Sequence, residues 1–205
     1  RGLGDVYKRQ HRYTYDVTDF QHLLKDSVEI DAFYSGWSSG FSVTLNFEFI
    51  EGTPPRTPII LSNIYKNGAA RYAYNNSTDF EANQMPEVKV TTSPNASSFK
   101  LQFVPTGHGA AGEFTPNVSY IAKVHGYVVG GETIWKDDCG FNAIWPQGGT
   151  WIFDRANWCP GEAVPIFNHE ITPYITAGDS ATFDINFSSF NPSDDASYSS
   201  DVQLF

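Results

Sequence analysis

Phe99-Lys-Leu-Gln-Phe103 alternates apolar and polar side chains, and repetition of this pattern along the chain decides the predicted fold. Alternation with a period of two is typical of a β-strand that buries one face. Phe183-Asp-Ile-Asn-Phe187 and Val118–Tyr127 continue the style, and Phe41–Ile50 is apolar at every odd position from 41 to 49. Val28–Phe33 alternates similarly, so we expect it to pair with 41–50 across the turn between them.

Glycine and proline separate these apolar runs, and many short strands with such turns predict an all-β fold, a β-sandwich of the jelly-roll type. The separating residues are Thr53-Pro-Pro, Pro105, Gly107–Gly112, Gly130-Gly131 and Gly148-Gly149.

The domain organisation is predicted from one proline-rich segment. Residues 53–58, within Glu51-Gly-Thr-Pro-Pro-Arg-Thr-Pro58, are the expected linker, and 59–205 is long enough for a nearly complete C-terminal jelly roll. Residues 11–52 hold too few strands to bury a core alone. We therefore expect them to be remnant strands of a truncated N-terminal jelly roll. Residues 1–10 resemble translated sequencing-adapter read-through and are left out of the fold prediction.

Composition excludes two classes of partner. The 205 residues are 40% hydrophobic and carry a formal net charge of −10, with a sequence pI near 4.8. Binding of nucleic-acid phosphates requires a basic face, so no nucleic-acid partner is expected. No apolar run approaches the ~20 residues that span a bilayer, so no membrane association is expected either.

The segment from Cys139 to Gly161, C-G-F-N-A-I-W-P-Q-G-G-T-W-I-F-D-R-A-N-W-C-P-G, holds both cysteines, three of the five tryptophans and Asp154-Arg155. Indole rings beside a guanidinium suit sugar faces and polar oxygens, which suggests a carbohydrate-handling protein. A disulfide here would close a loop of about twenty residues, stabilise by roughly 3 kcal/mol and imply an oxidising compartment. Two unrelated buried thiols are the alternative. Asp154 and Arg155 could form a mutual salt bridge, and Arg155 could also donate to a substrate.

A second candidate site is Thr106-Gly-His-Gly109, followed by Glu113-Phe-Thr-Pro116. Its glycines allow positive φ and close approach of the backbone to a ligand. Glu113 alone could be a solvated charge, and His108 alone is more often structural. No Cys/His cluster is present, so a zinc site has little support. No nucleophile elbow or phosphate loop occurs, and nucleophilic serine or cysteine catalysis is disfavoured.

Together these residues resemble the bacterial peptide-N-glycosidase F family over 13–205. Tyr15-Asp-Val-Thr-Asp-Phe-Gln-His-Leu-Leu24 through Glu51-Gly-Thr-Pro54 is similar to the end of its N-terminal domain. Thr106–Gly109 with Glu113-Phe is similar to its C-domain substrate loop, and Cys139–Gly161 is similar to its cystine loop. The resemblance implies two jelly rolls side by side with the active site between them, acting without metal or cofactor.

The resemblance implies a secreted or periplasmic amidase that cleaves N-glycans from asparagine in glycoproteins or glycopeptides, and we expect a monomer. It assigns catalysis to Glu113, which would help to bind the core GlcNAc and position water. It assigns substrate binding to Arg155, Trp158 and Trp37, together with His108 and Gly109 of the substrate loop. It also implies a Cys139–Cys159 disulfide.

The chain departs from the family in three places. The family's principal acid/base is an aspartate in a W-D-R stretch, which is absent from these residues, so we expect a fragment with negligible activity alone. Ser35 stands where the family has a second glutamate, and Thr115 stands at one position of a shorter disulfide. A non-catalytic glycan-binding β-sandwich is the alternative function. A copper monooxygenase on paired jelly rolls is disfavoured because no His-x-His motif is present.

Overall fold

The computed structural model describes residues 12–32, 42–65, 70–142, 144, 147–189 and 196–205. The chain divides into two compact units, Arg1–Ile59 and Ile60–Phe205, and each is described by itself. The predicted linker at 53–58 and the predicted domain limits stay predictions.

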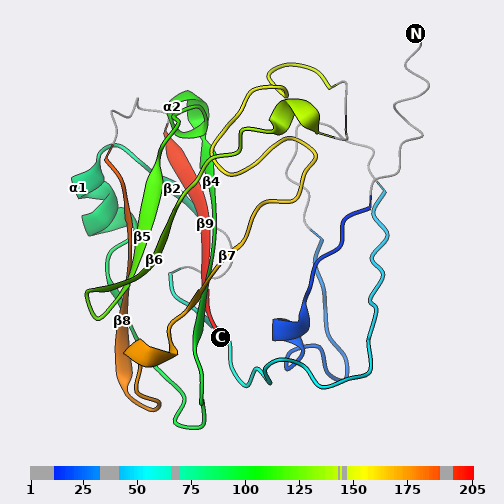
Figure 1. Cartoon of the computed structure of the whole chain (residues 1–205), viewed down its shortest axis with the longest axis vertical. Helices are drawn as coiled ribbons and strands as arrows, with labels where there is room; N and C mark the ends of the chain where they lie inside the picture. Colours follow the sequence, from blue (N-terminus) through cyan, green and yellow to red (C-terminus); the bar gives the residue numbers. More distant parts are fainter. Residues whose placement is uncertain (1–11, 33–41, 66–69, 143, 145–146, 190–195) are drawn as a thin grey trace. The chain divides into compact units, whose positions relative to one another are not determined.

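The second unit is built on two antiparallel β-sheets (Figure 1). Among the described residues, the larger sheet has five strands in the order β1-β9-β4-β7, with β2 also paired to β9. Its strands are β1 (Ser62–Asn63), β2 (Ala70–Ala73), β4 (Lys100–His108), β7 (Phe167–Glu170) and β9 (Ser197–Leu204).

The smaller sheet has the order β3-β8-β5-β6. Its strands are β3 (Val88–Thr91), β8 (Ser180–Phe187), β5 (Ser119–Val124) and β6 (Tyr127–Thr133). The structure therefore confirms the all-β prediction and the two-sheet sandwich, while the jelly-roll connectivity stays a prediction.

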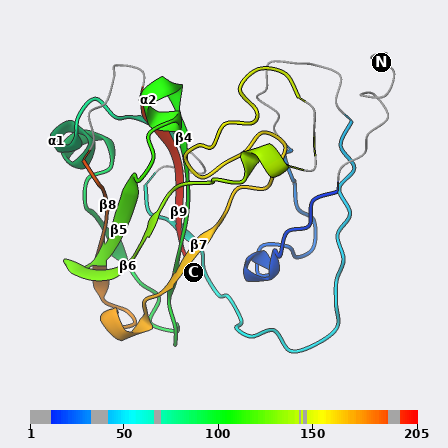
Figure 2. The same cartoon turned by 45° about the horizontal axis from the view of Figure 1, so that its top comes forward.

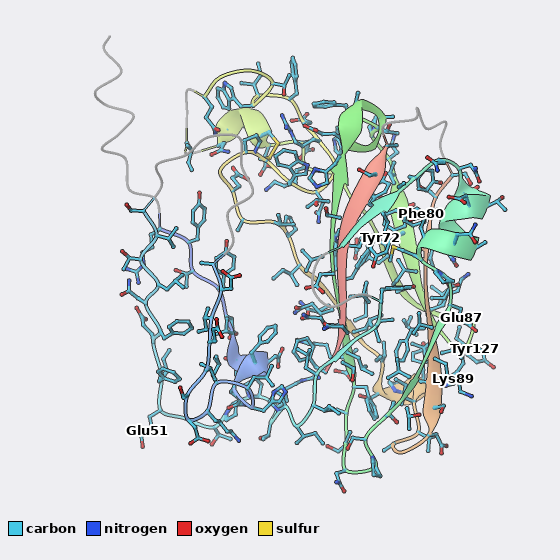
Figure 3. The ribbon with its side chains drawn as sticks, turned by 180° about the vertical axis from the view of Figure 1, so that it is seen from behind. Glu51, Tyr72, Phe80, Glu87, Lys89 and Tyr127 are labelled. Carbon is cyan, nitrogen blue, oxygen red and sulfur yellow. A yellow bond between two sulfur atoms is a disulfide. The ribbon has the colours of Figure 1, made fainter. Side chains whose placement is uncertain are left out.

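The alternation read from the sequence matches the burial of the central strands. In both β4 and β8 every second side chain is buried, as a strand with one face on the core requires. Aromatic rings join the two sheets across the core: Phe103 meets Tyr120 at 4.7 Å between centroids, and Phe187 meets Tyr198 at 4.6 Å. Two further buried rings, Tyr72 and Phe80, are labelled in Figure 3.

Short helical turns connect the strands. α1 and α2 lie at one end of the sandwich and η5 lies at the other (Figure 2). These turns are α1 (Ser77–Asp79), the π-helical η3 (Phe80–Gln84), α2 (Gly109–Glu113), η4 (Cys139–Phe141) and η5 (Thr172–Tyr174). None of the helices in the described part of the chain is long and apolar enough to cross a membrane.

The run Val118–Tyr127 is a hairpin rather than one strand. β5 ends at Val124 and β6 begins at Tyr127, because His125 (φ 50°) and Gly126 (φ 78°) reverse the chain. Two consecutive residues at positive φ form the kind of tight turn that joins twisted antiparallel strands.

The first unit corrects the predicted remnant strands. In its described residues, 12–32 and 42–59, the helical element is η2 (Thr18–Phe20), and these residues contain no β-strand. The alternating side chains of 43–49 stay open to solvent, with Val43 66% and Phe49 79% exposed. A strand pattern forms a sheet only where neighbours pair its backbone and cover its apolar face. The predicted strand residues 33 and 41 lie outside the described residues.

Candidate functional site

One side of the site is formed by the end of β4 and by α2, which lies directly beyond it (Figure 1). Gly109 has φ 75°, which lets the chain pass from His108 straight into the helix. A side chain at Gly107 would place its Cβ 2.1 Å from the carbonyl oxygen of Gly112 and 2.5 Å from the Cβ of Ala156. The close approach predicted from these glycines is therefore made to the protein's own chain.

Arg155 lies against α2 and holds the Glu113 carboxylate. Its Nη1 donates to Oε1 of Glu113 at 2.5 Å, its Nε donates to the carbonyl of Phe153 at 3.1 Å, and its Nη2 donates to the carbonyl of Thr150. The Arg155 side chain is 2% exposed and that of Glu113 is 17% exposed. Asp154, the partner suggested by the sequence, makes no ion pair with Arg155, whose guanidinium binds Glu113 and two backbone carbonyls instead.

Burial and pairing act on Glu113 in opposite directions. Burial raises the pKa of this carboxyl group, and the neighbouring Arg155 lowers it by a smaller amount, so its pKa lies above the ordinary value. Burial also lowers the pKa of Arg155, although the guanidinium stays charged at neutral pH because arginine titrates far above it. A carboxyl group with a raised pKa is a common feature of catalytic sites.

Trp158 and His108 form an aromatic surface beside this ion pair. Their ring centroids are 5.6 Å apart with planes inclined by 31°. The indole Nε1 donates to the carbonyl of Gly107 at 2.9 Å, and His108 Nε2 shares a 2.9 Å hydrogen bond with the Thr106 hydroxyl. The Arg155 guanidinium lies 4.7 Å from the centre of the Trp158 ring, within the range of a cation–π contact.

The cystine loop is closed and internally hydrogen-bonded. Cys139 and Cys159 form a disulfide with their Cα atoms 5.2 Å apart, so the alternative of two separate thiols is wrong. Asn142 is buried and donates to the carbonyl of Pro160, while Gln147 donates to the same carbonyl at 2.9 Å. These bonds hold Asn142 and Gln147 against Pro160, at the end of the loop.

Of the predicted site residues, the structure brings five together: Glu113, Arg155, Trp158, His108 and Gly109. Trp37 and Ser35 lie outside the described residues. Thr115 donates through its hydroxyl to the carbonyl of Ala111, within the turn that ends α2.

Sequence reasoning missed two residues of the site. Lys136 forms a backbone bridge with Arg155, in which each amide donates to the other's carbonyl at 2.9 and 3.1 Å. Asn157 is 2% exposed and donates to two proline carbonyls. An asparagine between Arg155 and Trp158 was the available signal, because asparagine tolerates the left-handed conformation better than most residues.

One group of three possible metal ligands occurs among the described residues: Asp138, Cys159 and Glu162. The Cys159 sulfur is already bonded to Cys139. The Lys136 ammonium lies 2.8 Å from the Glu162 carboxylate and 3.4 Å from that of Asp138. Both carboxylates are thus paired with a cation of the protein itself, and the donor set does not fit a metal.

Fold and site together define an all-β sandwich domain with a carboxylate–arginine pair and an aromatic surface at the end of one sheet. The family model described as "Peptide-N-glycosidase F, C terminal" matches residues 73–202. The chain belongs to this family.

The peptide-N(4)-(N-acetyl-β-D-glucosaminyl)asparagine amidase F of Elizabethkingia miricola is a curated relative. It is 25% identical over 178 residues, which cover 77% of this chain and 48% of the relative. The chain thus spans about half the length of this relative.

Solved structures support the fold. PNGase F, a glycosylasparaginase from Flavobacterium meningosepticum, matches with a TM-score of 0.61 at 19% identity, over 76% of this chain and 53% of that one. A second structure, a peptide-N(4)-(N-acetyl-β-D-glucosaminyl)asparagine amidase, matches with a TM-score of 0.58 at 18% identity, over 70% of this chain and 50% of the other.

Proposed function

We propose that this chain is part of a periplasmic or secreted amidase that hydrolyses the bond between asparagine and the core GlcNAc of N-glycoproteins or glycopeptides. The observation that carries the proposal is the Glu113 carboxylate, held by buried Arg155 beside the rings of Trp158 and His108. Membership of the peptide-N-glycosidase F family and the amidase named in the curated relative support the same chemistry.

In this proposal the site works through a carboxyl group and an aromatic surface. Burial raises the pKa of Glu113, so this group is suited to exchange a proton or hydrogen bond with water and with the amide of the core sugar. Arg155 fixes the orientation of this carboxylate from a buried position. Trp158 supplies an apolar ring face against which a sugar ring can pack.

Amide hydrolysis also needs a general acid or base at the leaving nitrogen. The family's aspartate in a W-D-R stretch has no counterpart in the 205 residues. The chain is therefore expected to bind N-glycopeptides without releasing the glycan. Mass spectrometry of a denatured glycoprotein after incubation tests this, because release converts asparagine to aspartate. Robust conversion by the chain alone would contradict the proposal that glycan release requires the W-D-R aspartate.

A glycan-binding domain without catalysis is the second candidate, and one observation favours it. Glu113 is engaged in an ion pair with Arg155, which makes it a weaker base than the same buried carboxylate would be without that partner. The two functions are distinguished by testing a longer protein in which a domain bearing W-D-R precedes this chain. The longer protein releases glycans if the chain is half of an amidase, and only binds them if it is a binding domain.

A further inference from the structure

We propose that Asn157 is a positioning residue of this site: it fixes the separation of Arg155 and Trp158, and thereby aligns the Glu113 carboxylate with the aromatic surface. This inference rests on the proposed function, because it assigns Asn157 to the same site. In this proposal Asn157 contacts neither the substrate nor a reacting atom. It acts through Arg155, two residues before it, and through Trp158, the next residue.

Strand β4 changes its neighbour along its length. β9 pairs with residues 101–108 of β4, whereas β7 pairs only with residues 100–103. Beyond that point the segment 156–158 occupies the edge that β7 leaves. The amide of Gly107 donates to the carbonyl of Ala156 at 3.1 Å, and Trp158 Nε1 donates to the carbonyl of Gly107 at 2.9 Å.

The side chain of Asn157 binds this edge of β4 at Pro105, where a neighbouring strand cannot form the usual pair of backbone hydrogen bonds. Pro105 offers a carbonyl oxygen but has no N–H, so a facing peptide carbonyl would lack a donor. Asn157 presents a donor instead: its Nδ2 donates to the carbonyl of Pro105 at 2.8 Å and to that of Pro165 at 3.3 Å. The amide thus meets two proline carbonyls, that of buried Pro105 and that of half-buried Pro165, through a side chain that is 2% exposed.

The backbone of Asn157 also turns the chain between Arg155 and Trp158. Its φ of 62° lies in the left-handed region, which asparagine adopts more readily than most residues. On one side, the amide of Ala156 donates to the carbonyl of Glu113 at 2.9 Å. On the other side, Trp158 reaches β4. The turn at Asn157 therefore lets Ala156 bind α2 while Trp158 binds β4.

Loss of the Asn157 amide is expected to loosen both contacts. Displacement of a catalytic group by about 1 Å costs on the order of 100-fold in rate, so a fixed Arg155 matters to a site built on Glu113. The shift is detectable without any substrate. Because Arg155 lowers the pKa of Glu113, a looser Arg155 raises it further.

The test uses the whole chain with Asn157→Gly, which keeps the positive φ and removes the amide. The control is Asn142→Gly in the same loop, since Asn142 is also buried and also donates to a proline carbonyl. The Glu113 carboxyl carbon is titrated by ¹³C NMR, with Glu113→Gln to assign its signal. We expect N157G to raise the midpoint by about 0.5–1 pH unit, part of the 1–3 units that an adjacent arginine produces.

The same variants are titrated with a synthetic peptide bearing one N-linked chitobiose, and N157G is expected to lower its affinity about tenfold or more. Both variants should lose thermal stability, but N142G should leave the midpoint and the affinity unchanged. If N157G does not fold, Asn157→Ser replaces it. A midpoint in the folded variant equal to that of wild type or N142G overturns the proposal. If wild type does not bind the glycopeptide, the proposed function is overturned instead. The NMR titration of Glu113 still tests the positioning role of Asn157 in that case.

Discussion

Replacing Arg155 by methionine is expected to lower the free energy of unfolding by about 3–5 kcal/mol. Arg155 is 2% exposed and donates to one carboxylate and two backbone carbonyls. The bond to the Glu113 carboxylate is worth about 1.5–3 kcal/mol and each bond to a neutral carbonyl about 1 kcal/mol. The expected loss agrees with the 3–5 kcal/mol typical of breaking a buried pair and leaving one charge without its partner.

Urea unfolding followed by tryptophan fluorescence at pH 7.5 measures this loss, and a double-mutant cycle assigns it. R155M/E113Q should be less destabilised than the sum of its single variants, because the second substitution removes the stranded carboxylate. R155K is the matched control: it keeps the charge and loses the fork that reaches Thr150 and Phe153, so an intermediate loss is expected. A loss below 1 kcal/mol in R155M, or additive single effects, would refute a buried ion pair at this site.

Three further predictions follow from the same region. Reduction of Cys139–Cys159, or its replacement by two serines, should lower stability by about 3 kcal/mol in calorimetry, because the bond closes a separation of 20 residues. Glu113 has a raised pKa, so the native state holds its proton to higher pH than the unfolded state does. The free energy of unfolding of wild type, relative to that of E113Q, should therefore fall as pH rises from the ordinary pKa of glutamate through the raised one. Urea unfolding between pH 4 and 7.5 measures this difference, and a rise with pH would contradict the prediction. Gly107→Ala should cost about 2 kcal/mol or more by overpacking, whereas Gly140→Ala, whose Cβ meets nothing nearer than 3.7 Å, should leave the melting temperature almost unchanged.

The central strands were predictable because their periodicity records burial directly. Phe99–Phe103 and Phe183–Phe187 lie in strands whose alternate side chains are buried, and both runs contribute to the core. The same pattern failed at 43–49, where the side chains are exposed and the described residues form no sheet. Periodicity reports the propensity for a half-buried strand, but the partner that pairs with it comes from tertiary structure.

The candidate site was predictable in membership more than in geometry. Cys139–Gly161 and the Glu113 segment were singled out from their composition and resemblance, and the structure brings both to the end of β4. The partner of Arg155 was not predictable from the sequence, because Asp154 is adjacent in the chain whereas Glu113 is 42 residues away. Asn157 was missed because its role depends on Pro105, a residue 52 positions earlier whose missing N–H creates the need for a side-chain donor.

Recognition of the core sugar of an N-glycan is assigned to the Glu113 carboxylate, which buried Arg155 holds in place, and to the ring of Trp158. Isothermal titration of the chain with a peptide bearing one N-linked chitobiose, beside the same peptide without sugar, tests it most directly. We expect the chain to bind the glycopeptide and not the sugar-free peptide, and Trp158→Ala to weaken this binding about tenfold or more, because a stacked aromatic ring is lost. Equal affinity for the two peptides, or unchanged affinity in Trp158→Ala, would contradict it.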